Sequence, residues 1–154
     1  MTALAEAPAI DTVLAAAKTN PLVWAKLYLP HDVPLDYAPM HYDLMGLATT
    51  HRRTAFAAPR DHAKSTLCQK VLPLWAALEQ PYGRPEQLLC VSASEDMAAG
   101  WLRKIKYELQ SNAAIRWRYG DQETAKWTEN YLELKNKTTL RGLGAEAAIR
   151  GRRP

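Results

Sequence analysis

Residues 58–65 of the chain read Ala-Pro-Arg-Asp-His-Ala-Lys-Ser, and this stretch carries most of the fold prediction. In the phosphate-binding pattern G-x-x-x-x-G-K-[ST], Ala58 and Ala63 take the two glycine positions, Lys64 the lysine and Ser65 the hydroxyl. In such loops, backbone N–H groups at a strand-to-helix turn point toward phosphate, and the helix dipole adds positive potential. Because alanine tolerates positive φ poorly, Ala63 can take the role of the glycine only if its φ stays negative.

Lys64 and Ser65 are the side chains of this loop that can act on a nucleotide. A lysine at this position reaches the β- and γ-phosphates of ATP, and a serine hydroxyl can ligate Mg²⁺. We therefore predict ATP and Mg²⁺ as ligands, with Ser65 as the protein ligand of the metal. The alternative is an ordinary strand-to-helix turn with a chance Lys-Ser pair at the start of the helix.

The segments on either side of the loop suit this interpretation. Residues 54–58 (Thr-Ala-Phe-Ala-Ala) form a short apolar run that predicts a buried strand entering the loop. After the loop, apolar residues recur at helical spacing at Leu67, Val71, Leu74, Trp75 and Leu78. Pro73 lacks a backbone donor and is expected to kink this helix.

Further elements are expected on both sides of this unit. Residues 1–36 read as a helical and extended arm, with helices near 11–18 and 21–29. Residues 87–92 (Gln-Leu-Leu-Cys-Val-Ser) predict a strand covered on both faces. The helix after it has a predicted core stripe at Met97, Trp101, Ile105 and Leu109.

Near the C-terminal end, residues 131–135 and 138–141 flank Asn136-Lys137 and predict a β-hairpin. Gly142, Gly144 and Gly151 then punctuate an arginine-bearing end with no closing element expected. The predicted fold class is therefore α/β: a parallel sheet of the P-loop NTPase type, flanked by helices and carrying a hairpin.

Composition and charge exclude several classes of protein. The chain of 154 residues is 47% hydrophobic and 23% charged, which is ordinary for a globular protein, and no apolar run is long enough to span a membrane. Its two cysteines and four histidines lack metal-ligand spacing, and a reducing cytoplasm is expected. The net charge is +4, and the late arginines Arg141, Arg150, Arg152 and Arg153 suit either DNA phosphates or a solvated face.

An acidic partner for the phosphate loop is missing from the sequence. Hydrolysis of ATP needs a carboxylate at the end of another strand to organise Mg²⁺ and one to activate water. No apolar run ends in Asp-Asp or Asp-Glu; the nearest pair, Glu95-Asp96, fits a helix start. We therefore expect the chain to be the front portion of a larger ATPase, with little or no turnover alone.

Four passages resemble the N-terminal ATPase region of the large terminase subunits of tailed bacteriophages. The loop at 59–66 is similar to that family's variant phosphate loop, which carries an arginine near its start. Residues 89–98 resemble its second strand and the start of the next helix. Residues 105–120 and 143–152 are similar to the runs that follow that helix and precede the acidic motif.

The resemblance implies that residues 37–154 form the first part of an ATPase domain, without the acidic motif and the C-terminal nuclease domain. Family members hydrolyse ATP to drive double-stranded DNA into the procapsid in the host cytoplasm. They act as a homo-oligomeric ring with a portal protein and a small terminase subunit.

Carried over by position, the resemblance implies catalytic roles for Lys64 on the β- and γ-phosphates and for Arg60 on the γ-phosphate. The nucleotide-binding set that it implies is Pro59, Arg60, Asp61, His62, Ala63, Lys64, Ser65, Thr66 and, as an adenine contact, His41. Three of these residues have a simpler alternative: a structural salt bridge for Arg60, solvent for His62, and a core position for His41.

Two other functions fit the same residues. A helicase-like P-loop ATPase shares the first strand-loop-helix unit. A nucleotide-binding module without turnover, such as a prophage remnant, fits the missing acidic strand.

Overall fold

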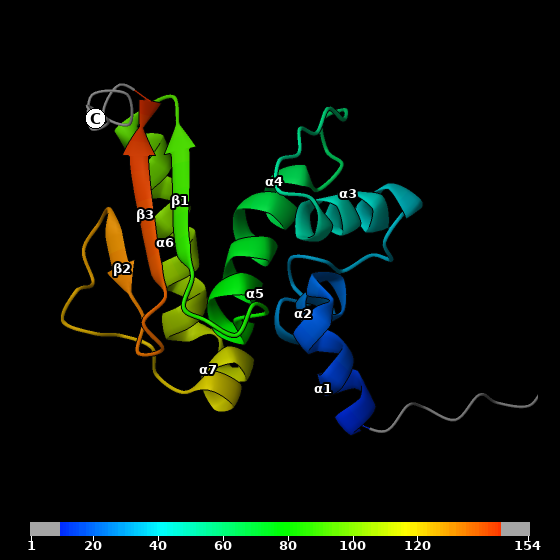
Figure 1. The fold of residues 1–154 in the computed structure, drawn as a ribbon, viewed down its shortest axis with the longest axis horizontal. Coiled ribbons are helices and arrows are strands. Elements are labelled where there is room, and N and C mark those ends of the chain that lie inside the picture. The colour runs from blue at the N-terminus through cyan, green and yellow to red at the C-terminus, as the bar shows by residue number, and fades with distance from the viewer. Residues whose placement is uncertain (1–9, 146–154) are drawn as a thin grey trace, which may run out of the picture. The chain divides into compact units, whose positions relative to one another are not determined.

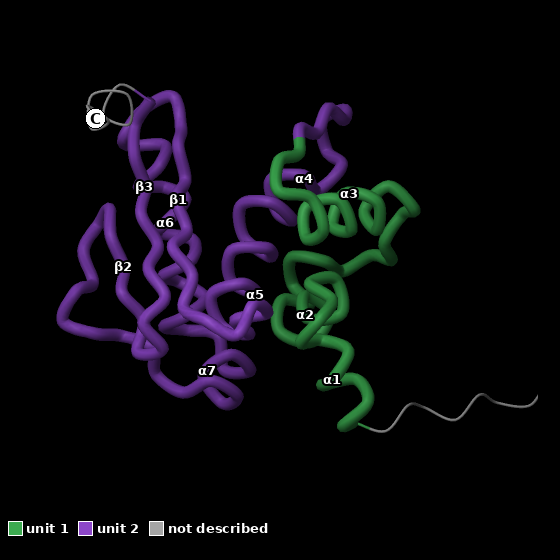
Figure 2. Tube along the Cα trace, in the orientation of Figure 1, with its two compact units in different colours: residues 1–54 green, residues 55–154 purple. Residues whose placement is uncertain are grey.

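The computed structural model describes residues 10–145, and the chain divides into two compact units between Thr54 and Ala55 (Figure 2). The first unit consists of three helices: α1 (Ile10–Thr19), α2 (Pro21–Tyr28) and α3 (Pro39–Thr50). The predicted helices near 11–18 and 21–29 are confirmed. Residues 1–9 and 146–154 lie outside the described residues, and so do the predictions for Arg150, Gly151, Arg152 and Arg153.

Asn20 explains where α2 begins. Its side-chain Oδ1 accepts hydrogen bonds from the backbone N–H groups of Leu22 at 2.9 Å and Val23 at 3.4 Å, which satisfies donors that the first turn leaves free. Pro21 occupies the first turn, where its missing N–H costs nothing. The helix then buries Trp24 completely, with its ring 5.1 Å from that of Tyr28.

The second unit contains a three-stranded mixed sheet in the order β1-β3-β2 (Figure 1). Strand β1 (Gln87–Ser92) pairs with β3 (Thr139–Gly144) in parallel, and β2 (Tyr131–Glu133) pairs with β3 antiparallel. The predicted strand at 87–92 and the predicted hairpin are both confirmed, and the fold is α/β. The parallel sheet is confirmed for β1 and β3 only.

The helix α6 (Glu95–Ser111) packs on this sheet, and α7 (Ala113–Tyr119) follows it. Two glycines of β3 allow the close approach. A Cβ at Gly142 would lie 2.9 Å from the Ala98 carbonyl oxygen, and one at Gly144 would lie 2.9 Å from the Glu95 nitrogen. The prediction that these glycines belong to an irregular end is therefore wrong, because they are strand residues selected for contact with α6.

The opposite face of β1 is open, contrary to the prediction that both faces are covered. Leu89 is 50% exposed and Val91 is 52% exposed, and alternate residues of the strand show the same pattern. On α6, Trp101, Ile105 and Leu109 are buried as predicted, whereas Met97 is 60% exposed. Within the described residues, one layer of helix covers one face of the sheet.

The predicted helix after the loop forms in three consecutive parts: α4 (Lys64–Thr66), a π-helical turn η1 (Leu67–Val71) and α5 (Leu72–Glu79). The π turn ends at Val71, two residues before Pro73, where a kink was predicted. In an α-helix, an N–H at position 73 would bond to the Gln69 carbonyl, and proline has none. The indole Nε1–H of Trp101 donates to that carbonyl instead, which ties α6 to η1.

The predicted strand at 54–58 does not form. No strand is assigned between residues 51 and 63, and most of this segment is exposed. Its alanines bury little surface, and Pro59 cannot donate to a sheet ladder. The loop therefore follows a segment without regular secondary structure rather than a strand of the sheet.

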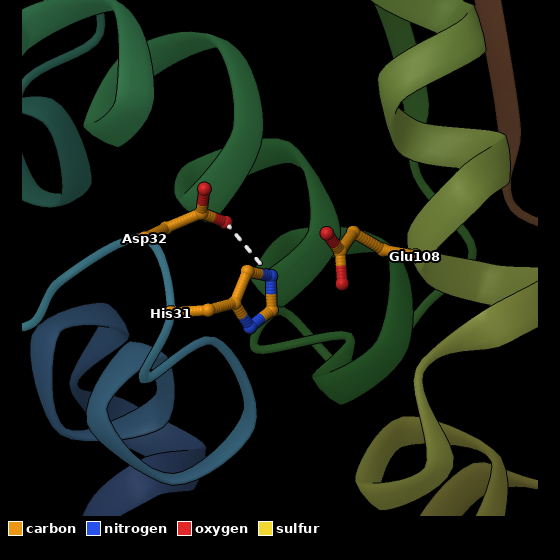
Figure 3. A group of neighbouring side chains, drawn as sticks. All are labelled: His31, Asp32 and Glu108. Carbon is orange, nitrogen blue, oxygen red and sulfur yellow. Dashed lines mark ion pairs between the residues drawn. The ribbon is translucent and has the colours of Figure 1, made fainter.

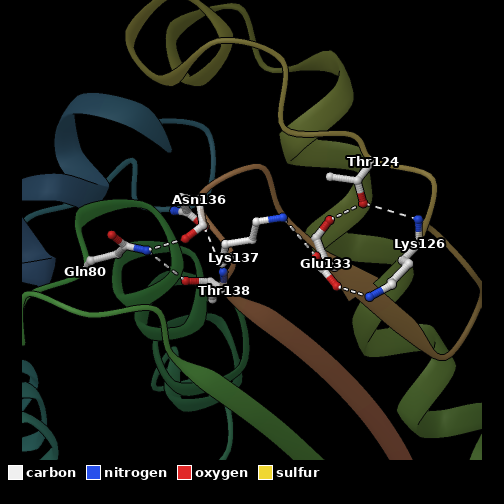
Figure 4. A network of polar contacts seen from close by, with 7 residues as sticks. All are labelled: Gln80, Thr124, Lys126, Glu133, Asn136, Lys137 and Thr138. Atoms are coloured by element: carbon white, nitrogen blue, oxygen red, sulfur yellow. Dashed lines mark hydrogen bonds and ion pairs between the residues drawn. The ribbon is translucent and has the colours of Figure 1, made fainter.

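The hairpin turn is anchored to the end of α5 (Figure 4). Gln80 Nε2 donates to the Asn136 carbonyl at 3.0 Å and to Thr138 Oγ1 at 3.2 Å, while Asn136 Nδ2 donates to the Ala77 carbonyl at 2.7 Å. Lys137 takes the left-handed conformation that the turn needs, with φ 71°. These contacts fix where β3 begins.

Beside the turn, Lys126 Nζ lies 2.7 Å from Glu133 Oε2 (Figure 4). The hydrogen bond from Lys126 lowers the pKa of the Glu133 carboxyl. Among the helices of residues 10–145, none has both the length and the apolar character that crossing a membrane requires.

Candidate functional site

The loop that precedes α4 is built on two residues with left-handed backbone. Asp61 has φ 63° and Ala63 has φ 51°, so the condition of a negative φ at Ala63 is not met. Ala63 is the N-cap residue of α4, and its carbonyl accepts the Leu67 N–H at 2.8 Å. Left-handed backbone costs alanine about 1 kcal/mol, a cost that glycine avoids. Ala63 thus adopts a backbone conformation that is typical of glycine, although the residue is alanine.

An open pocket of about 640 Å³ lies at the loop. Seven consecutive residues line it: Arg60, Asp61, His62, Ala63, Lys64, Ser65 and Thr66. All seven belong to the predicted nucleotide-binding set, and Pro59 directly precedes them. One short segment therefore brings a guanidinium, an imidazole, an ammonium and two hydroxyls to a single concave surface.

Lys64 is turned back onto its own loop. Its Nζ donates to the carbonyl oxygens of Ala58 and Pro59. These bonds hold the ammonium at the loop. They already have an ionised donor, so a phosphate that bound Lys64 would replace them with a contact in which the acceptor is charged as well.

Arg60 and His62 sit on the exposed rim. Among residues 10–145, Arg60 has no carboxylate within 4.0 Å, so the alternative of a structural salt bridge to Asp61 finds no support. His62 Nδ1 lies 2.7 Å from the Arg60 carbonyl oxygen. Since that oxygen can only accept, Nδ1 carries the proton and Nε2 of a neutral ring is an acceptor. Ser65 is exposed at the start of α4.

His41 lies on α3 in the first unit, whereas the loop belongs to the second unit. Its Nδ1 accepts the Ala38 N–H at 3.0 Å, so Nε2 carries the proton of a neutral ring. This Nε2 is buried and has no hydrogen-bond partner among the described residues. The Tyr37 ring stands edge-on at 5.9 Å. Burial, and then the charge of Tyr42, raises the pKa of Tyr37 to about 12. The adenine contact at His41 stays a prediction.

Further charged side chains, which sequence reasoning did not single out, are held in ion pairs within each unit. In the first unit, His31 Nε2 lies 3.4 Å from Asp32 Oδ2 (Figure 3). In the second unit, the buried Glu108 of α6 lies 2.7 Å from Lys70 Nζ and accepts from Asn112 Nδ2 at 2.8 Å. The Lys70–Glu108 pair joins η1 to α6. A lysine and a glutamate 38 positions apart leave no local signal that would predict it.

Both predicted thiols are partly buried and unpaired. Burial raises the pKa of Cys68 and of Cys90 above the usual range, which disfavours the reactive thiolate. Neither lines the pocket at the loop.

The chain was compared with protein-family models and with curated protein sequences. No family model matches it, and no curated protein matches it.

Proposed function

We propose that residues 58–66 bind the phosphates of ATP, and that the chain supplies the ATP-binding part of a motor of the terminase large-subunit class. Such a motor moves double-stranded DNA into a procapsid. In the same proposal, the intact protein works in the host cytoplasm as a ring, together with a portal protein and a small terminase subunit.

One observation carries the phosphate-binding part of this proposal. The seven lining residues place Lys64 and Ser65 directly after a left-handed turn, at the start of a helical segment that runs to Glu79. Free N–H groups at a helix start and a positive dipole favour an anion there, and the ammonium of Lys64 adds a full charge.

The side chains have distinct parts in binding. Lys64 exchanges its bonds to Ala58 and Pro59 for the β- and γ-phosphates. Arg60, unpaired on the rim, neutralises charge on the γ-phosphate with its planar guanidinium. The Ser65 hydroxyl is the group that would hold Mg²⁺, and Thr66 lies one position further along for the α-phosphate. When bound, Mg²⁺ would neutralise part of the phosphate charge.

The pocket does not offer a good base for hydrolysis. Asp61 is the only carboxyl group among its lining residues, and it is exposed. A general base has to be positioned within hydrogen-bond reach of the proton that it takes up, and packing does not hold an exposed side chain in such a position. The same observation favours a second function, nucleotide binding without turnover, for the chain by itself.

A phosphate series tests the proposal directly. Equilibrium binding of AMP, ADP and ATP with Mg²⁺ should show affinity that rises with each phosphate, because Lys64 and Arg60 act on the outer ones. In the variant Ser65→Ala, the gain from adding Mg²⁺ should disappear while Mg²⁺-free binding remains. Equal affinity for AMP and ATP would contradict the proposal.

A further inference from the structure

The most exposed large apolar side chain among residues 10–145 is Trp117 on α7, which is 85% exposed. The orientation of this helix is set by Ile115, which is completely buried and holds the opposite side of α7 against the unit. Placing an indole in water forgoes one of the largest burial gains available to any side chain. An exposed tryptophan on an ordered helix therefore indicates a surface that a partner covers.

The neighbours of Trp117 leave its ring open. On a helix, the residues three and four positions earlier lie beside a side chain, and here both are alanine, Ala113 and Ala114. Methyl groups cannot cover an indole face. The ring is available for stacking.

Two arginines flank the ring in sequence, and both are exposed. Arg116 Nη1 donates to the Gln110 carbonyl at 3.0 Å, and the Arg118 guanidinium lies 5.9 Å from the centre of the Tyr119 ring. Within residues 10–145, neither has a carboxylate within 4.0 Å. These contacts orient the guanidiniums without neutralising them.

The charges around α7 support an anionic partner. Asp121, the acidic residue that follows the helix, lies 3.4 Å from Lys135 Nζ, and its pKa is lowered by the backbone N–H of Glu123, by Lys135 and by the charge of Arg116. On α6 the situation differs, because Arg103 is paired with Asp96 at 3.4 Å and with Glu129 at 3.0 Å. The positive charge of α7 is therefore only partly compensated.

We propose that the surface of Arg116, Trp117 and Arg118 binds single-stranded nucleic acid. Every unpaired base has a flat face that can stack on the open indole, and the two guanidiniums match backbone phosphates. A duplex keeps its bases stacked internally and offers no such face to Trp117. An acidic protein would match the arginines alone and would leave the open indole without a role.

The test is binding of a labelled oligothymidylate of about 16 nucleotides at low salt, followed by fluorescence anisotropy. Stacking of one base predicts that Trp117→Ala weakens binding about tenfold. Replacing both arginines in Arg116→Gln/Arg118→Gln should flatten the plot of log affinity against log salt by about 1.4. Leu89→Ala, which removes an exposed apolar side chain elsewhere, and Arg84→Gln, which removes an exposed arginine elsewhere, are controls, and both should bind as wild type does.

Several results would overturn this inference. One is that Trp117→Ala binds the oligonucleotide as tightly as the wild type does, with an unchanged circular dichroism spectrum. The others are that a duplex of the same length binds more tightly, that polyglutamate competes as well as the oligonucleotide, or that the wild type does not bind. The last three would assign the surface to a duplex, to an acidic protein, or to no nucleic acid. The inference is independent of the phosphate loop, so Lys64→Ala should keep oligonucleotide binding and Trp117→Ala should keep nucleotide binding.

Discussion

Replacing Gly142 with alanine tests the packing of α6 on β3 with a calculable cost. The new Cβ would lie 2.9 Å from the Ala98 carbonyl oxygen and 3.1 Å from both the carbonyl carbon and the Cβ of Ala98. Real Cβ atoms do not come this close to an oxygen, and two of the three atoms belong to the backbone of a helix. Relief therefore requires α6 to move away from the sheet.

Overpacking of this kind costs about 1–3 kcal/mol, and alanine recovers about 0.4–1 kcal/mol by restricting the unfolded chain. We expect a net loss of about 1–2 kcal/mol. Gly100→Ala is the matched control, because its Cβ would meet only the flexible end of Arg103 at 3.5 Å. In mid-helix, that change should stabilise by up to about 1 kcal/mol.

Urea denaturation followed by circular dichroism measures both free energies of unfolding. The two glycine-to-alanine substitutions should shift the urea midpoint in opposite directions. A Gly142→Ala protein as stable as the wild type would refute the close approach of α6 to β3.

Three further changes have expected outcomes. Because φ is 51° at Ala63, Ala63→Gly should leave the free energy of unfolding unchanged or raise it by up to about 1 kcal/mol, whereas Ala63→Val should lower it. A clear loss of stability in the glycine variant would contradict the left-handed turn. Trp101→Phe should destabilise by about 1–3 kcal/mol in urea, because the Gln69 carbonyl loses its donor, while Trp127→Phe, which removes a buried N–H without a described partner, should cost less. Tyr37 has a pKa raised to about 12 in the folded chain, against an ordinary value of 10.0, so stability should hold below pH 10 and fall as the pH rises toward 12. Tyr37→Phe should reduce that fall in the urea midpoint, and an identical fall in both proteins would exclude Tyr37 as its source.

Elements with local signals were predicted well from the sequence. The Asn20-Pro21 pair marks the start of α2, and the apolar run at 87–92 becomes β1. The turn at Asn136-Lys137 separates the strands of the hairpin. In each case the side chains that specify the element lie within it or next to it.

The predictions that failed concern features that depend on contacts between residues far apart in the sequence. The run at 54–58 has an apolar pattern, but a strand also needs a neighbour to pair with, and none is assigned there. Gly142 and Gly144 look like loop residues until α6 is placed against them. The bond from Trp101 to Gln69 joins residues 32 positions apart and has no sequence pattern.

The candidate site divides in the same way. The residues of the loop motif line one pocket because the loop is one continuous segment, and their binding of a nucleotide stays a prediction. The backbone of Ala63 does not meet the condition of a negative φ, since intrinsic preference yields where a tight turn requires positive φ. The inward bonds of Lys64 to Ala58 and Pro59 depend on how the loop curls, which the motif does not specify.

The most direct test of the proposed function is calorimetric titration of ATP and Mg²⁺ into the wild type, Lys64→Ala and Lys104→Ala. Lys104 is an exposed lysine on α6 outside the pocket, so it controls for the loss of one positive charge. Losing a hydrogen bond to a charged group is worth about 1.5–3 kcal/mol, so Lys64→Ala should weaken binding by about 10- to 100-fold while Lys104→Ala binds as the wild type does. Equal ATP affinity in Lys64→Ala and wild type, or no binding by the wild type, would contradict the assignment of this loop.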